Sequence, residues 1–170
     1  MAIEEARYHT LEQDGKFEIR DYAAHVIAET IVQGGLEQAG KEAFPKLFRY
    51  ISGDNRSRAK LAMTAPVGQR PAQGKWAVSF MMPATQGLET LPGPEDLNVV
   101  LRQVPARRVA AVRYSGFWDE KGYLRYRHEL EAWILAKGLA VAGEPVWARY
   151  NSPFTPWFLR RNEILVPVEG

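Results

Sequence analysis

Cationic side chains gather in two short tracts of this sequence. Arg56, Arg58 and Lys60 alternate with small residues in the first tract, and Arg160 and Arg161 are adjacent in the second. A guanidinium group can hold a carboxylate through two parallel hydrogen bonds, so each tract could bind an anionic group. Exposed cations on loops that bind nothing are an equally ordinary explanation.

Apolar side chains accompany both tracts. Phe48 lies on a helical apolar stripe just before the first tract, and Met63 follows that tract. Trp157 and Phe158 follow Pro156, and Leu159 separates them from the second tract. Such residues could form the wall of an apolar ligand site, although a helical stripe and a lone methionine are more often core.

Three histidines could supply an imidazole to a metal ion. His25 opens a β-branched segment in which Ile27 and Glu29 share its face, so it is the best candidate ligand, with a structural role as the alternative. His9 lies in an N-terminal segment, and His128 falls away from the apolar stripe of its helix. We therefore expect His128 to be exposed.

The sequence contains no motif of a known enzyme class. There is no cysteine, no nucleophile elbow, no paired-histidine metal motif and no phosphate-binding glycine loop. Glu29 or Glu163 could act as a base in a pocket, but an ion-paired carboxylate is the more ordinary reading. Arg161 and Glu163, two positions apart, could form such a pair. We therefore predict a protein that is not an enzyme.

Composition limits the class of protein and its partners. The chain has 170 residues, is 46% hydrophobic and carries a formal net charge of +2. These values fit one domain spanning residues 1–170 and give no reason to expect a nucleic acid partner. The sequence has no run of membrane-spanning length and no apparent signal peptide, so we predict a cytoplasmic protein without a membrane partner. The oligomeric state is left open.

The first half of the chain reads as strands around one helix. Residues 16–20 alternate in polarity and residues 25–32 are rich in β-branched side chains, which predicts two strands. Apolar residues at three- and four-residue steps predict a helix from Leu36 to about Ile51, with a kink or restart at Pro45. Residues 61–67 then lead into a strand at 76–82, and a surface connection follows from Pro83 to Pro94.

The second half repeats this order. Strands are predicted at residues 98–103, 108–114, 146–150 and 164–168, with a helix between the first and second pair. Asp119 is a suitable N-cap and Gly138 a suitable stop for that helix. Two strand-strand-helix-strand-strand units predict a pseudo-twofold α+β domain, in which a distorted, barrel-like sheet is partly covered by two helices and leaves a concavity for a ligand.

Several segments together resemble the SOUL, or haem-binding protein, family. They are residues 18–22, residues 43–55, Met-Thr-Ala-Pro-Val at 63–67, residues 79–83 and Arg-Arg-Asn-Glu at 160–163. The resemblance covers most of the chain and implies a barrel-like sheet with two helices, similar to the effector-binding domains of GyrI-like proteins. Some members carry a histidine in the segment corresponding to 18–22, where this chain has Asp21.

The resemblance implies reversible, non-covalent binding of haem or a related tetrapyrrole in a shallow apolar cleft with a cationic rim. The residues expected to bind it are Arg56, Arg58, Lys60, Arg160 and Arg161 at the propionates, Phe48, Met63, Trp157 and Phe158 in the wall, and His25 as axial ligand. Tyr22 and Tyr50 are alternative donors to ferric iron. A GyrI-like domain that binds or sequesters flat, often cationic drugs is the second hypothesis, and it would favour a buried carboxylate.

Overall fold

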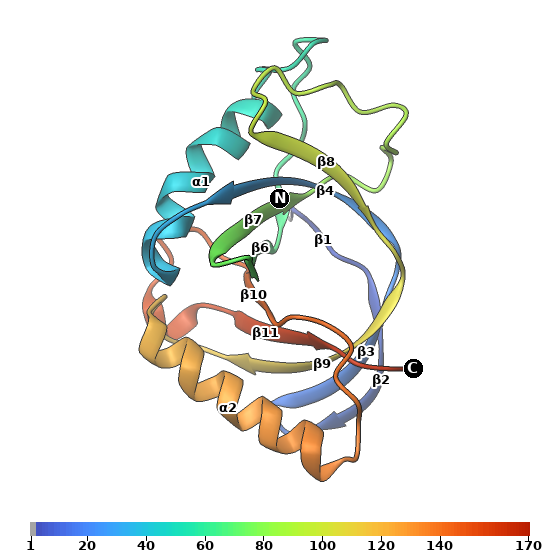
Figure 1. The fold of residues 1–170 in the computed structure, drawn as a ribbon, viewed down its shortest axis with the longest axis vertical. Helices are drawn as coiled ribbons and strands as arrows, with labels where there is room; N and C mark the ends of the chain where they lie inside the picture. The colour runs from blue at the N-terminus through green and yellow to red at the C-terminus, as the bar shows by residue number, and fades with distance from the viewer. Residues whose placement is uncertain (1–2) are drawn as a thin grey trace.

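The computed structural model describes residues 3–170 as a large antiparallel sheet with two helices (Figure 1). The first half of the chain forms β2 (Tyr8–Asp14), β3 (Phe17–Tyr22), β4 (His25–Val32), α1 (Leu36–Ile51), β6 (Val67–Ala72) and β7 (Lys75–Met81). The second half forms β8 (Val99–Val104), β9 (Arg107–Tyr114), α2 (Glu120–Ala136), β10 (Val146–Arg149) and β11 (Asn162–Pro167). Two short strands, β1 (Glu4–Glu5) and β5 (Thr64–Ala65), pair in parallel, and a single 3₁₀ turn spans Trp157–Leu159.

The order of strands in the sheet confirms the pseudo-twofold plan. The nine strands run β2-β3-β9-β11-β10-β6-β7-β4-β8, and each neighbouring pair is antiparallel. If β2 is left out, the order has twofold symmetry. The strands β3, β9, β11 and β10 of one half then correspond to β8, β4, β7 and β6 of the other half. The axis therefore passes between β10 and β6. The sheet curves but stays open, with β2 and β8 at its edges.

Each helix covers one half of the convex face. In β4, Val26, Ala28 and Val32 pack in the core beneath α1. In β9, Ala110, Val112 and Tyr114 pack in the core beneath α2. Because side chains alternate along a strand, the intervening residues of β4 and β9 are directed toward the concave face. Both strands are thus buried on one side by a helix and free to line a cavity on the other.

The ends of the helices follow the sequence signals. The Asp119 side chain accepts a hydrogen bond from the Gly122 amide at 2.8 Å, which confirms it as the N-cap of α2. Gly138 has φ of 71° just after the helix, a conformation that glycine adopts without the cost of a side chain. In α1, Pro45 lies inside one uninterrupted helix, so the restart expected there does not occur.

Four strands differ from the sequence prediction. β2 was not predicted, and its side chains are mostly exposed because it forms an edge strand that pairs only with β3. β6 begins at Val67 and extends to Ala72, beyond the tract at 61–67 that was expected to lead directly into the next strand. β1 and β5 are two-residue strands without a sequence signal. Within residues 3–170, no helix is long and apolar enough to cross a membrane; the cytoplasmic location stays a prediction.

Candidate functional site

A cavity of about 500 Å³ lies on the concave face of the sheet. Its volume is within the range of roughly 300–1,000 Å³ that small-molecule sites occupy. Strands from both halves of the chain contribute, and their inward side chains give it a largely apolar wall that includes Ile27, Met81, Val104, Val109, Val146 and Leu165. The curvature of the sheet therefore produces the ligand-sized concavity that the sequence predicted.

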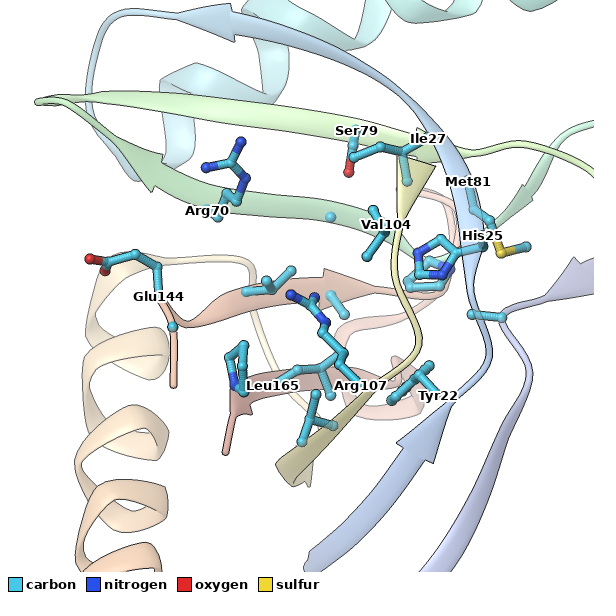
Figure 2. A pocket seen from close by; sticks show the side chains of 18 of the residues that line it. Tyr22, His25, Ile27, Arg70, Ser79, Met81, Val104, Arg107, Glu144 and Leu165 are labelled. Carbon is cyan, nitrogen blue, oxygen red and sulfur yellow. The ribbon is translucent and has the colours of Figure 1, made fainter. Parts of the chain in front are cut away.

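His25 lines this cavity from the start of β4 (Figure 2). Its Nδ1 lies 3.1 Å from the carbonyl oxygen of Ala23. A carbonyl can only accept, so Nδ1 carries the proton and the neutral ring keeps its lone pair on Nε2. Burial, together with the nearby charges of Arg107 and Arg102, lowers the pKa of His25 despite the opposing hydrogen bond to Ala23. A neutral imidazole whose other nitrogen donates to a carbonyl is the usual state of a metal-ligating histidine.

A carboxylate held by two arginines forms the polar part of the wall. Glu29, on the same face of β4 as His25, accepts from Arg70 of β6 at 3.1 and 3.3 Å. Arg102 of β8 donates to the same carboxylate at 3.3 and 3.4 Å. Glu29 is only 8% exposed, whereas the two arginine side chains remain partly in solvent. We call these three residues the Glu29 cluster.

Arg107, the first residue of β9, also lines the cavity, and Figure 2 shows its guanidinium reaching into it. Burial lowers the pKa of Arg107, and the neighbouring charges of Arg102 and Arg70 lower it further, while Tyr22 acts in the opposite direction. Its neighbour Arg108 is paired with Asp21 at 2.8 and 3.1 Å. The cavity is therefore apolar over most of its wall and cationic along one side.

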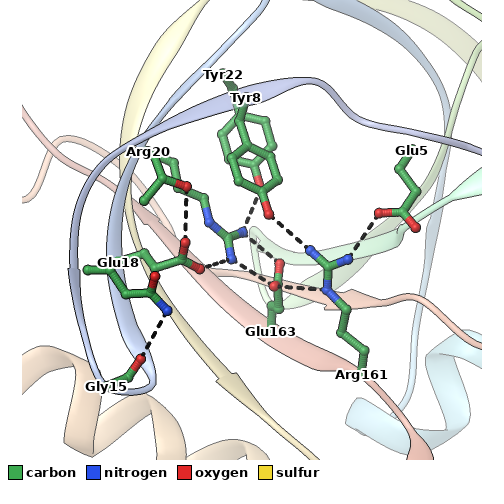
Figure 3. Close-up of polar contacts among 10 residues, drawn as sticks. Glu5, Tyr8, Gly15, Glu18, Arg20, Tyr22, Arg161 and Glu163 are labelled. Carbon is green, nitrogen blue, oxygen red and sulfur yellow. Dashed lines mark hydrogen bonds and ion pairs between the residues drawn. The ribbon is translucent and has the colours of Figure 1, made fainter.

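A second carboxylate with two arginines lies farther along the concave face (Figure 3). Glu163 of β11 receives two hydrogen bonds from Arg20, at 2.7 and 2.8 Å, and one from Arg161 at 3.1 Å. The side chains of Glu163 and Arg20 are fully buried. Burial would raise the pKa of Glu163, but the hydrogen bonds and charges of the two arginines outweigh it, so the pKa lies below its usual range. We call these residues the Glu163 cluster.

The N-terminal segment covers the Glu163 cluster. Arg161 donates to the Glu5 carboxylate at 3.0 Å and to the Tyr8 hydroxyl at 3.1 Å. Tyr22 accepts from Arg20 at 2.9 Å and also lines the cavity, so it borders both regions. Burial raises the pKa of Tyr22 to about 12. The concave face is thus divided into a closed ionic part and an accessible pocket.

The first group of predicted site residues lies outside this pocket. Arg56, Arg58 and Lys60 are exposed in the loop after α1. Phe48 is 48% exposed near the end of α1 and stacks on Phe44 with ring centroids 5.8 Å apart. Met63 is half-buried against the core beneath α1. These residues surround one end of α1, and their role in binding stays a prediction.

The second group belongs to the C-terminal tract. Trp157 and Phe158 form an exposed aromatic cluster, in which Trp157 stacks on Phe117 at 5.0 Å. Arg160 lies 4.1 Å from the centroid of the Trp118 ring and donates to the carbonyls of Thr155 and Pro153. Arg161 belongs to the Glu163 cluster, so both arginines of this tract already have protein partners. Of the ten residues expected to bind the tetrapyrrole, His25 alone lines the concave pocket, together with Tyr22, the alternative iron donor.

The sequence reasoning missed the arginines of the pocket. Arg70, Arg102 and Arg107 lie on three different strands and carry no motif. Their local sequence gives little signal, because Arg70 and Arg102 each follow or precede a glutamine and Arg107 is followed by Arg108. A charged side chain on the inward face of a strand requires a partner or a ligand, but the inward face is known only once the strand order is known.

Comparison with known proteins agrees with this fold and with a binding role. The family model described as SOUL heme-binding protein matches residues 3–167. Mouse heme-binding protein 1 is 26% identical over 137 residues, covering 76% of this chain and 71% of that protein. Human heme-binding protein 2 is 28% identical over 168 residues, covering 89% of this chain and 81% of that protein.

The fold is also that of a solved protein domain. The crystal structure of the EcmrR C-terminal domain superimposes with a TM-score of 0.71 at 13% identity, covering 95% of this chain and 98% of that one. This likeness concerns the arrangement of strands and helices. Because the family model spans nearly the whole chain, the protein belongs to the SOUL heme-binding protein family.

Proposed function

We propose that this protein binds haem or a related tetrapyrrole reversibly in the concave pocket and acts as a carrier, buffer or sensor, without catalysing a reaction. The observation that carries the proposal is His25, whose Nδ1 is tied to the Ala23 carbonyl while the ring lines an apolar cavity. Membership of a family described as heme-binding supports the ligand class.

The pocket supplies what a porphyrin requires. The flat macrocycle needs an apolar wall, which residues such as Ile27, Val104 and Leu165 provide. Ferric or ferrous iron accepts a neutral imidazole nitrogen, and Nε2 of His25 is the candidate. The propionates need cations, and the arginine side of the pocket provides them. Bound haem would add its own redox and ligand-binding chemistry, while these residues would only hold it.

The surface near the end of α1 is the alternative site. There the stacked Phe44 and Phe48 rings are exposed, and the cations of the following loop form no ion pair with another residue of 3–170. This surface is open, so a porphyrin there would keep one face in solvent. We favour the pocket because it offers an enclosing wall together with an imidazole.

Binding of a flat cationic drug is the second functional hypothesis, and the pocket chemistry disfavours it. A buried cation needs a carboxylate that is free to pair with it. Glu29 is already held by Arg70 and Arg102, and Glu163 by Arg20 and Arg161. The remaining carboxylate of the pocket lining, Glu144, is exposed at its edge. The same pairing argues against Glu29 or Glu163 as a catalytic base.

Titration with hemin tests the proposal. We expect a saturable shift of the Soret absorption band at micromolar hemin, and excess tetraphenylphosphonium should not displace it. The His25→Ala variant should change the position of the band, whereas His128→Ala, with its side chain 80% exposed on α2, should not. Absence of a saturable shift in the unmodified protein would rule out haem binding. An unchanged spectrum in His25→Ala would remove His25 as axial ligand, and loss of binding in Phe48→Ser with retention in His25→Ala would move the site to α1.

A further inference from the structure

Arg107 differs from the other arginines of the pocket in having no counter-ion. Arg70 and Arg102 share Glu29, and Arg108 pairs with Asp21. Among residues 3–170, no hydrogen bond or ion pair joins the Arg107 guanidinium to another side chain. Nevertheless its side chain is half-buried and directed into the cavity (Figure 2).

The surroundings of Arg107 make this arrangement costly without a ligand. A half-buried guanidinium without a carboxylate loses part of its hydration and gains no ion pair in return. The like charges of Arg102 and Arg70 lie close enough to lower its pKa further. An anion bound at this position would offset both effects at once.

The charge balance of the pocket points in the same direction. Its lining contains the four arginines 70, 102, 107 and 108 and the carboxylates Glu29 and Glu144. Even with Asp21, the partner of Arg108, one positive charge remains in excess when His25 is neutral. That excess lies beside an apolar wall, so the complementary ligand combines an apolar body with an anionic group.

We infer that the concave pocket is built for an organic anion and that Arg107 is the residue that binds its carboxylate. Where the ligand is the tetrapyrrole proposed above, Arg107 holds a propionate, and in that form the inference rests on the proposed function. The guanidinium can meet a carboxylate through two parallel hydrogen bonds. Arg160 and Arg161, by contrast, would have to give up existing partners to do so.

Comparing the affinities of an acid and its ester separates the contribution of the carboxylates from that of the apolar body. Protoporphyrin IX and its dimethyl ester share one macrocycle without iron, so axial ligation by His25 does not contribute. We expect the free acid to bind at least about tenfold more tightly than the diester, as charge-assisted hydrogen bonds allow. Arg107→Gln should abolish this preference, and Arg107→Lys should retain part of it because the charge remains. Quenching of tryptophan fluorescence measures each affinity.

A variant of the loop after α1 is the matched control. Arg56→Gln combined with Arg58→Gln and Lys60→Gln removes three exposed cations and leaves the pocket untouched. This triple variant should keep the preference for the free acid. Loss of the preference in the triple variant with its retention in Arg107→Gln would overturn the inference, as would equal affinities of acid and diester in the unmodified protein.

A smaller probe distinguishes failure of the inference from failure of the proposed function. Pyrenebutyrate and its methyl ester form another flat apolar pair that differs in one carboxylate. If porphyrins do not bind but pyrenebutyrate does, with a preference lost in Arg107→Gln, the pocket binds anions and tetrapyrrole binding is wrong. If hemin binds, but Arg107→Gln leaves the preference for the acid over the ester unchanged in both pairs of ligands, tetrapyrrole binding stands and the role of Arg107 is wrong.

Discussion

The concave face carries the same chemical unit twice, in opposite environments. In both the Glu29 cluster and the Glu163 cluster, one carboxylate is held between two arginines. Arg70, Arg102 and Arg20 come from other strands, and Arg161 directly precedes β11. Arg20 and Glu163 have fully buried side chains, whereas the side chains of Arg70 and Arg102 are 33% and 42% exposed. Both clusters consist of one glutamate and two arginines, so the difference between them lies in burial. We expect the buried Glu163 cluster to be structural and the more exposed Glu29 cluster to respond to a ligand.

Solvent access explains the difference in physical terms. Water screens the exposed pairs and can replace their hydrogen bonds, so each contributes roughly 0–1 kcal/mol to stability. The buried pair has no such replacement: without Glu163, Arg20 keeps its ion pair with Glu18 but loses its fully buried partner, at a cost of up to about 3–5 kcal/mol. The Glu163 cluster therefore links the N-terminal segment, β3 and β11, and we expect the Glu29 cluster to contribute less to stability.

The largest expected effect is that of Glu163→Gln. The substitution keeps the shape of the side chain but removes the charge that holds Arg20 through two hydrogen bonds, leaving the pair with Glu18, so the free energy of unfolding should fall by up to about 3–5 kcal/mol. Urea unfolding followed by circular dichroism measures this loss. Glu29→Gln in the other cluster is the matched control and should cost no more than about 1 kcal/mol. Equal losses in the two variants would contradict the distinction between the clusters.

The pH dependence of stability should also reflect the buried position of the Glu163 cluster. The folded state lowers the pKa of Glu163, so its contribution is complete above the ordinary pKa of a glutamate and is lost as pH falls through the folded value. We expect the free energy of unfolding of the unmodified protein to decline below about pH 4.5, which is near the pKa of a glutamate in the unfolded chain. The decline should be shallower in Glu163→Gln, as measured by urea midpoints between pH 7 and pH 3. Parallel pH profiles of the two proteins would show that other carboxylates govern acid unfolding.

The two clusters also show what a sequence can and cannot reveal. Helix periodicity, Asp119 and Gly138 predicted α2 because its signals are local, and the repeated order of elements predicted the pseudo-twofold sheet. The edge strand β2 escaped prediction because pairing with β3, and not burial of an apolar face, stabilises it.

The candidate site was harder to predict because ion pairing is a long-range property. Arg161 looked like a ligand-facing cation, yet one of its carboxylate partners, Glu5, lies at the other end of the chain. Its other partner, Glu163, is two residues away, and this local pair was foreseen. Arg107 carries no local mark at all. It became a candidate only when the strand order placed it in the pocket, where no carboxylate of residues 3–170 forms an ion pair with it.

The smallest expected effect is the most informative about the pocket. Glu29→Gln leaves Arg70 and Arg102 in place but removes their counter-ion, so the pocket gains one positive charge beside Arg107. Because these arginines are partly exposed, the gain is screened, and we expect the affinity for protoporphyrin IX to rise only a few-fold at low salt and less at high salt. The dimethyl ester should bind this variant and the unmodified protein equally. A fall in affinity for the free acid would mean that Glu29 positions the two arginines for the ligand, and the Glu29 cluster would then be as rigid a part of the fold as the Glu163 cluster.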